Sequence, residues 1–156
     1  MSKIEARLVE LGFPLPEVAK PVAAYVPSVV SGNLVFTSGQ LPFVNGALPA
    51  SGKVGTTDEL VDPATAKGLA RLCALNALAA VKLAIGDLDR VTRVVKVVGF
   101  VSSVPEFTGQ PGVMNGASEF LVEVFGDAGV HARSAVGVPC LPLDSAVEVE
   151  LIVEFN

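Results

Sequence analysis

The segment from Arg93 to Val101 is a nearly continuous run of β-branched residues, and it restricts the possible folds more than any other feature of the chain. Its core, Val94 to Val98, lacks the alternation of apolar and polar residues that a strand with one solvated face shows. A long helical pattern precedes the run, between Asp62 and Gly86, and a second one follows it, between Pro111 and Gly126. We therefore predict a central strand connected to two long helices.

Further strands are expected before and after these helices. Residues Val22 to Val30 predict an extended segment, Ser31-Gly32-Asn33 a turn, and Leu34 to Thr37 a buried strand, which together form a hairpin. Two more strands, Ala132 to Val138 and Val147 to Phe155, follow the second helix. The order β-β-α-β-α-β-β indicates an α+β fold with a mixed sheet and both helices on one face. Because the central run shows no alternation of polar and apolar residues, we expect the other face to be apolar and covered by another copy of the chain.

The remaining segments fit a single domain over residues 1–156. Apolar residues recur at helical spacing before Gly12, which predicts an N-terminal helical extension of about residues 1–20. From Pro42 to Val61 the chain is rich in Gly, Pro, Ser and Thr and has no period, so we predict a long surface loop. Within this loop, Asn45-Gly46 is typical of a small hairpin turn.

The composition excludes several classes of protein. With 51% hydrophobic and only 17% charged residues, the chain is expected to bury further apolar surface in an oligomer. The net charge of −5 argues against a nucleic-acid partner, which would require a basic face. No apolar run of about 18 residues suggests a membrane span, and the charged N-terminus does not resemble a signal peptide, so a cytoplasmic location is expected. Cys73, Cys140 and the single His131 do not suffice for a Cys/His metal site.

A charged residue at the start of an apolar strand raises the question of function. Arg133 begins the strand after the second helix, and Glu148 and Glu150 share one face of the last strand. A guanidinium is always charged and fits a carboxylate with two parallel hydrogen bonds. From these residues alone, an ion pair with Glu148 or Glu150 on a neighbouring strand is the commoner arrangement, and a carboxylate ligand is the alternative.

Several motifs form a pattern that extends from Val22 to Phe155. They are Ala132-Arg133-Ser134, Leu141-Pro142, Val147-Glu148-Val149-Glu150 and Ser31 to Gln40, together with Tyr25, Phe107 and Val113-Met114-Asn115. This pattern resembles the RidA/YjgF family of imine deaminases. The two blocks near the ends of the pattern are specific in combination, whereas each alone is weak.

The resemblance implies a chorismate-mutase-like (YjgF-like) α+β fold, assembled as a homotrimer with three ligand clefts between subunits. It also implies an enzyme that hydrolyses 2-imino or 2-enamino acids to 2-keto acids and ammonia. Neither a metal nor an organic cofactor is implied, and the small carboxylate-bearing substrate would be the partner. A non-catalytic trimer that binds 2-keto acids or related metabolites is the alternative.

The resemblance also assigns site residues. Arg133 would clamp the substrate carboxylate, and Glu148 would orient water as an ionised neighbour of that arginine. The other substrate-binding positions are Tyr25, Ser38, Gly39, Asn115 and, through its backbone carbonyl, Ala135. Each has an ordinary structural alternative: core packing for the tyrosine, a strand-ending turn for the serine and glycine, and a helix start for the asparagine.

The chain departs from the family pattern at several positions. His131 replaces a proline, Ala135 a cysteine, and Ser118-Glu119 an aromatic residue, while the long loop and the N-terminal helix exceed the short members. These differences indicate a longer subgroup. We expect His131 to be structural, and its isolation argues against a ribonuclease, an activity attached to some family members.

Overall fold

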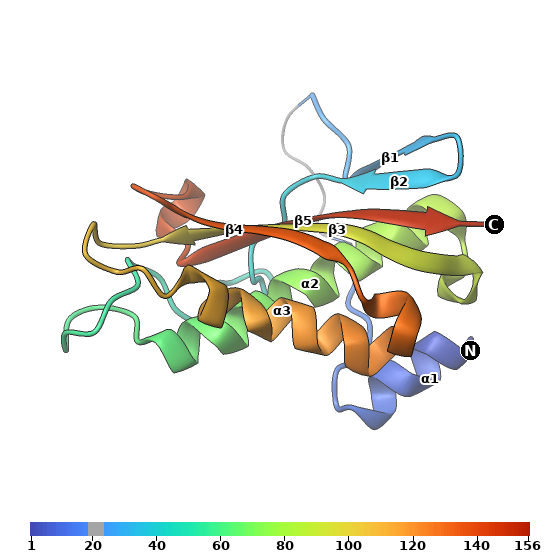
Figure 1. Cartoon of the computed structure of the whole chain (residues 1–156). Helices are drawn as coiled ribbons and strands as arrows, with labels where there is room; N and C mark the ends of the chain where they lie inside the picture. Colours follow the sequence, from blue (N-terminus) through green and yellow to red (C-terminus); the bar gives the residue numbers. More distant parts are fainter. Residues whose placement is uncertain (19–23) are drawn as a thin grey trace.

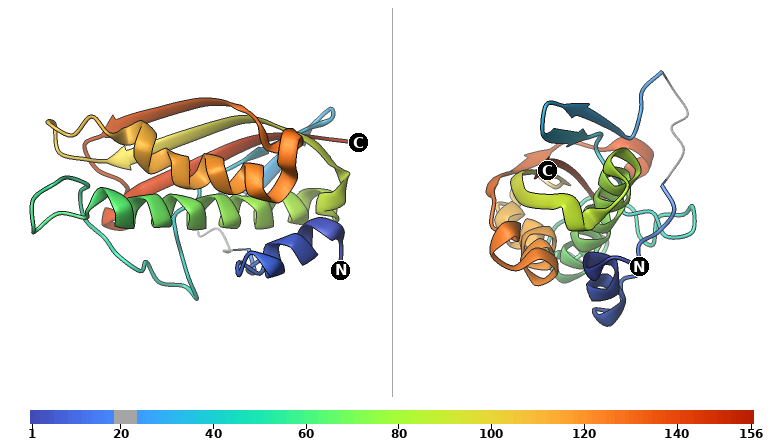
Figure 2. Two further views of the ribbon diagram at one scale, coloured as in Figure 1. Left: turned by 60° about the horizontal axis from the view of Figure 1, so that its bottom comes forward. Right: turned by 90° about the vertical axis from the view of Figure 1, so that its right-hand side faces the viewer.

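Two long helices pack side by side on one face of a five-stranded sheet in the computed structural model, which describes residues 1–18 and 24–156 (Figures 1 and 2). The helices are α1 (Lys3–Glu10), α2 (Pro63–Ile85) and α3 (Gln110–Phe125), with short 3-10 helices η1 (Leu88–Arg90), η2 (Gly126–Gly129) and η3 (Pro142–Asp144). The strands are β1 (Ser28–Ser31), β2 (Leu34–Thr37), β3 (Val91–Ser102), β4 (Ala132–Val138) and β5 (Val147–Phe155). The predicted α+β fold and order of elements are confirmed.

The sheet has the strand order β1-β2-β5-β3-β4, and only β3 and β4 run parallel. Parallel neighbours need a long crossover connection, which α3 supplies. The predicted central strand is an interior strand, because β3 is paired on both sides. As a result, β3 separates β4 from β5, so the charged residues of those two strands are not on adjacent strands.

Both long helices begin and end close to the expected residues. The Asp62 side chain caps α2 by accepting the backbone N–H of Thr65 at 2.9 Å, and Gly86 follows the helix with a φ of 84°. The helix α3 begins one residue before Pro111 and ends before Gly126, whose φ is 62°. Positive φ values of this kind favour glycine, which explains the two stop signals.

The core lies between the helices and one face of the sheet. Every second residue of β5 is buried there: Val147, Val149, Leu151 and Val153. By length and composition α2 could cross a membrane. Here its apolar residues are mostly buried against the sheet and α3, as in a core helix.

The open face of the sheet is less apolar than expected. Phe100 pairs with Glu148 and Val98 pairs with Glu150, so carboxylates alternate with apolar side chains on this face. Phe36 is 41% exposed. The prediction of an apolar face was wrong in part, because the glutamates of β5 and Lys96 of β3 lie among the apolar side chains of this face.

The segments before α2 differ in part from expectation. In the loop, Val44 and Ala47 form an antiparallel bridge around Asn45 and Gly46, which both have positive φ, so the predicted small hairpin turn is confirmed. The first strand is shorter than the extended segment predicted from Val22 to Val30, since β1 begins only at residue 28. Residue 22 lies outside the described part of the chain.

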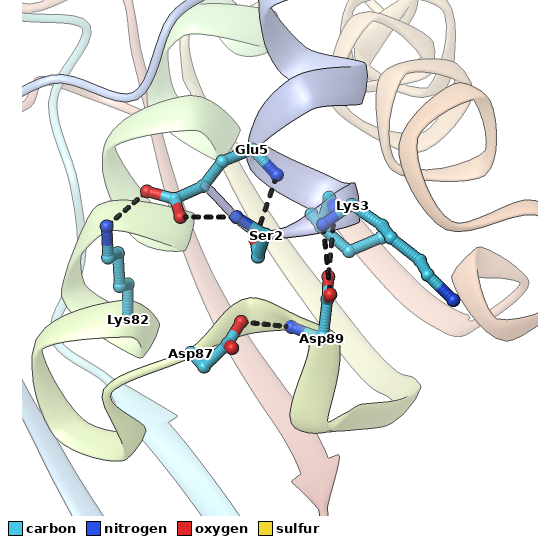
Figure 3. A network of polar contacts seen from close by, with 7 residues as sticks. Ser2, Lys3, Glu5, Lys82, Asp87 and Asp89 are labelled. Atoms are coloured by element: carbon cyan, nitrogen blue, oxygen red, sulfur yellow. Dashed lines mark hydrogen bonds and ion pairs between the residues drawn. The ribbon is translucent and has the colours of Figure 1, made fainter.

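The N-terminal helix is fastened to the rest of the domain by polar contacts (Figure 3). The Asp89 carboxylate accepts the first backbone N–H groups of α1, those of Lys3 and Ile4, each at 2.9 Å. Glu5 on α1 forms an ion pair with Lys82 on α2. A helix has free N–H groups in its first turn, so a carboxylate from another segment both caps α1 and fixes its position.

We predict that Gly116→Ala destabilises the chain by about 2 kcal/mol or more, because the added methyl overfills a packed contact. A Cβ at this position would overlap the Lys67 carbonyl oxygen, so α2 and α3 would have to separate. The matched control is Gly112→Ala in the same helix, where a Cβ meets open space. Urea unfolding should show the loss for the first variant only; equal stability of both would contradict the close helix contact.

We also predict that acid loosens α1. Backbone N–H groups of Ile4 and Lys3 lower the pKa of the Asp89 carboxyl group. The resulting stabilisation is complete above the ordinary Asp pKa of about 3.9 and is lost as the pH falls through the lower value of the folded chain. Hydrogen-exchange protection factors of α1 should therefore fall on acidification. In Asp89→Asn they should start lower and change less, and protection independent of pH in the natural chain would refute the role of this carboxylate.

Candidate functional site

Arg133 lies on β4 and faces the helix layer. It pairs in register with Val97, which is fully buried beneath the helices. Its Nη1 donates to the Asn115 Oδ1 at 2.9 Å and to the Ser118 Oγ at 3.2 Å. Both acceptors lie on α3, one turn apart and on the same side of the helix. The guanidinium is thus held between β4 and α3 by two neutral oxygen atoms.

No carboxylate of the described chain pairs with this arginine. The ion pairs of residues 1–18 and 24–156 are Arg7–Glu10, Lys67–Glu119 and Lys82–Glu5. The ion pair considered from the sequence, between Arg133 and Glu148 or Glu150, does not form. The reason is the strand order, which places β3 between the two strands, and the alternation of side chains, which sends the arginine and the glutamates to opposite faces.

Ser118 and His131 adjoin Arg133, and the sequence reasoning did not place them in the site. The His131 Nε2 lies 2.8 Å from the Ser118 Oγ, and its Nδ1 lies 2.6 Å from the Gly129 carbonyl oxygen. The spacing of Asn115 and Ser118 by three residues on a predicted helix was the available signal. We name Asn115, Ser118, Arg133 and Ala135 the arginine half of the site. Ala135 belongs to it because alternate residues of β4 share a face.

A second group of predicted residues gathers around Glu148 on the open face. A Cβ on Gly39 would lie 2.5 Å from the Glu148 Oε1, so the glycine lets the carboxylate lie against the backbone in this position. Ser38 next to it is fixed by its Oγ, which donates to the Val26 carbonyl at 2.6 Å, and by its N–H, which donates to the Pro27 carbonyl at 2.8 Å.

These contacts bring Tyr25 into the same region, since it directly precedes Val26. Its side chain is 52% exposed, so it is not a core residue of the single chain. We name Tyr25, Ser38, Gly39 and Glu148 the glutamate half of the site. An exposed tyrosine offers both an apolar ring and a hydroxyl group to a ligand or to a second chain.

Glu148 has an unusual carboxyl group. Burial raises its pKa, and the negative charge of Glu150 raises it further. From the sequence we expected Glu148 to be an ionised carboxylate beside Arg133. Within one chain, Arg133 lies on the other face of the sheet. The raised pKa makes this carboxylate a stronger base than an ordinary glutamate.

The structure thus brings Arg133 together with Asn115 and Ala135, and Glu148 together with Ser38 and Gly39. It does not bring the two halves together within one chain. A separate hollow of about 570 Å³ lies near Lys53, Phe107, Gln110 and Pro139, and its lining contains none of the predicted site residues.

Comparison with known proteins places this geometry in a family. The family model described as YjgF/chorismate mutase-like, putative endoribonuclease, matches residues 5–155. Protein TCP17 of Trypanosoma cruzi is 44% identical over 155 residues, which are 99% of this chain and 95% of that protein. The crystal structure of Atu1372 from Agrobacterium tumefaciens, of unknown function, is 49% identical with a TM-score of 0.90, and covers 98% of this chain and 92% of its own. A putative endoribonuclease from Shewanella oneidensis is 34% identical with a TM-score of 0.92, and covers 99% and 100%.

More distant solved structures carry the names of the family's known members. They include TdcF with bound serine and the YjgF gene product, both from E. coli, and RidA from an Antarctic Psychrobacter. Their identities are 25%, 29% and 26%, their TM-scores 0.63, 0.65 and 0.61, and they cover 90%, 90% and 89% of this chain and 94% of their own. The sequence motifs, the mixed sheet with its two helices and these matches agree: the chain belongs to the YjgF/RidA family and has its chorismate-mutase-like fold.

Proposed function

We propose that this protein hydrolyses 2-imino or 2-enamino acids to 2-keto acids and ammonia, with Arg133 binding the substrate carboxylate. The observation that supports the proposal most directly is that the Arg133 guanidinium is held in place without an acidic partner. Nη1 is anchored by Asn115 and Ser118, and no carboxylate of the described residues neutralises the charge. A half-buried guanidinium with an unpaired charge is suited to a carboxylate ligand, which it binds with two parallel hydrogen bonds.

The nature of the ligand is supported by a relative. TdcF is described with bound serine, a small molecule that carries a carboxylate and a nitrogen on the adjacent carbon. A 2-imino acid has the same arrangement of these two groups. The relative supports the class of ligand, while the turnover of an imine depends on the second half of the site.

Glu148 is the proposed acid and base. Its raised pKa suits it to accept a proton from water as the water oxygen bonds to the imine carbon. That proton then passes to the nitrogen, which gives a carbinolamine. The carboxylate next takes the proton of the new hydroxyl group and passes it to the nitrogen, so the C–N bond breaks and ammonia leaves as the carbonyl group forms. We assign to Ser38 and Gly39 the positioning of the substrate against the glutamate, and to the Ala135 carbonyl the holding of the water.

Both halves of the site are needed for this reaction, so we propose that it takes place between subunits of a homotrimer. The arginine half lies at β4, an edge strand with one unpaired side, and the glutamate half lies on the open face of the sheet. A cyclic trimer would apply the edge of one chain to the open face of the next. Exposed apolar side chains near both regions, among them Val29, Phe36 and Val136, support such contact.

A non-catalytic trimer that binds 2-keto acids would use the same arginine and is the second candidate. The endoribonuclease description of the family is less compatible with this chain, because the net charge of −5 opposes RNA binding. Steady-state turnover distinguishes the first two functions: release of ammonia from imines made from several amino acids supports the enzyme, and binding without release supports the carrier.

We predict that Arg133→Ala lowers kcat/KM for imine hydrolysis by about 100-fold or more, because a charged hydrogen bond to the ligand carboxylate is lost. Arg133→Lys keeps the charge but not the planar fork and should recover little activity. Ammonia release coupled to amino-acid oxidation measures the effect. Arg7→Ala, an exposed arginine of α1, is the control and should leave the rate unchanged. An Arg133→Ala chain with full activity would disprove the mechanism.

We further predict complementation between two inactive chains. Arg133→Ala and Glu148→Gln trimers should each be inactive, whereas trimers refolded from an equal mixture should recover about a quarter of the natural activity, because each mixed trimer then contains one intact cleft. Light scattering should give three times the chain mass of 16.0 kDa for every sample. If mixing restores nothing although mixed trimers form, the two residues do not meet across subunits.

A further inference from the structure

Four groups on three segments form one continuous line of hydrogen bonds that ends at Arg133. The Arg133 Nη1 lies 3.2 Å from the Ser118 Oγ, the Ser118 Oγ lies 2.8 Å from the His131 Nε2, and the His131 Nδ1 lies 2.6 Å from the Gly129 carbonyl oxygen. The line joins β4 and α3 to the segment that contains the end of η2 and the residues before β4. Each distance is short enough for a hydrogen bond.

With a neutral imidazole, only one assignment of the protons satisfies all these contacts. A guanidinium can only donate, so the Ser118 oxygen accepts from Arg133. A carbonyl oxygen can only accept, so the His131 Nδ1 must carry a proton and donate to Gly129. The neutral ring then has an unprotonated Nε2, which accepts the hydroxyl proton of Ser118. The proton order is therefore Arg133 to Ser118 to His131 to the Gly129 carbonyl.

The Ser118 hydroxyl group forms its hydrogen bonds with Arg133 and His131. A serine within a helix often bonds back to the carbonyl of the preceding turn. The Ser118 Oγ bonds instead to the arginine and the histidine, which lie outside the helix. Because the serine hydroxyl donates its hydrogen bond to the His131 Nε2, the lone pairs of the oxygen stay directed at the guanidinium. Bonds linked in this way polarise one another, and the positive charge at one end strengthens the whole line.

The line fixes which edge of the guanidinium is engaged. Asn115 and Ser118 both bind Nη1, so two acceptors separated by one helical turn hold the same nitrogen. Among residues 1–18 and 24–156, no hydrogen bond is formed by Nε or Nη2 of this arginine. These two nitrogen atoms form one flat edge that matches the two oxygen atoms of a carboxylate.

We infer that Ser118 and His131 are positioning residues for the carboxylate-binding arginine. They hold Nη1 and thereby present the Nε–Nη2 edge to the ligand. This inference rests on the proposed role of Arg133. Neither residue touches the substrate in this assignment; His131 acts through Ser118, and Ser118 acts through Arg133. The ligand class is a small molecule with a free carboxylate next to an imine or keto carbon.

Affinity for 2-oxobutanoate, measured by isothermal titration calorimetry on the full chain, tests the inference. Ser118→Ala should bind this probe about tenfold more weakly, since the lost group is a neutral acceptor for a charged donor. Ser118→Thr keeps the hydroxyl group and should restore affinity. Glu119→Ala, the adjacent α3 residue that pairs with Lys67, is the matched control and should bind normally.

The order of action along the line gives a second readout. His131→Ala should weaken binding less than Ser118→Ala, and the double variant should bind no more weakly than Ser118→Ala alone. With an imine substrate, the loss should appear in KM with kcat nearly unchanged, as expected for a group that orients the binding arginine. Losses that add in the double variant would overturn the linked arrangement.

The histidine itself can be observed directly because it is the only one in the sequence. In a tag-free sample, 15N NMR of the imidazole should show the Nδ1–H form, with a proton absent from Nε2. A ring protonated at Nε2, or one that averages between both forms, would overturn the inference. Ser118→Ala should allow the ring to change form, and Glu119→Ala should not.

The results separate this inference from the proposed function. If no imine is turned over but 2-oxobutanoate binding depends on Ser118 and Arg133, the deaminase proposal fails and the positioning role holds. If Arg133→Ala loses binding and Ser118→Ala does not, the positioning role alone fails. If Arg133→Ala binds as tightly as the natural chain, both fail.

Discussion

The close contact between α2 and α3 is the constraint on which the rest of the structure depends. Gly116 lies against the Lys67 carbonyl, so the backbone of α3 approaches α2 more closely than a side chain would permit. This contact fixes the rotation of α3 about its own axis. Asn115 and Ser118, which flank the glycine, then point toward β4 and reach the guanidinium of Arg133. The packing of an apolar core thus determines the orientation of the polar group that we assign to ligand binding.

The sheet divides the candidate site between its two faces. Alternation along each strand sends Arg133 to the helix side and Glu148 to the open side, and β3 lies between their strands. In the proposed reaction, a single chain therefore holds two halves of one site, and the halves differ in character. One contains a fixed positive charge without an acid, and the other contains a carboxyl group whose pKa is raised by burial and by a second carboxylate. Association of chains is the simplest way in which the two can act on one molecule.

Local patterns allowed most of the fold to be predicted, and long-range geometry accounts for the errors. The run from Arg93 to Val101 and the capping residue Asp62 depend on neighbours in sequence, so their structures were correctly expected. The ion pair of Arg133 with Glu148 or Glu150, which was considered from the residues alone, does not form, because strand order is a property of the whole sheet. The contact between His131 and Ser118 joins residues 13 apart, and no spacing rule connects a helix to a residue that lies beyond its end. The open face was expected to be apolar because the expectation rested on the central strand alone, and the glutamates of β5 were not considered.

The contact between Gly39 and Glu148 also restricts how the sequence can evolve. A side chain at position 39 would collide with the Glu148 carboxylate in its present position, so the two positions are not free to change independently. A residue larger than glycine at position 39 would require the flexible Glu148 side chain to turn away from its present position. A substitution at position 39 is therefore expected to move the acid as well, although it leaves the glutamate itself unchanged.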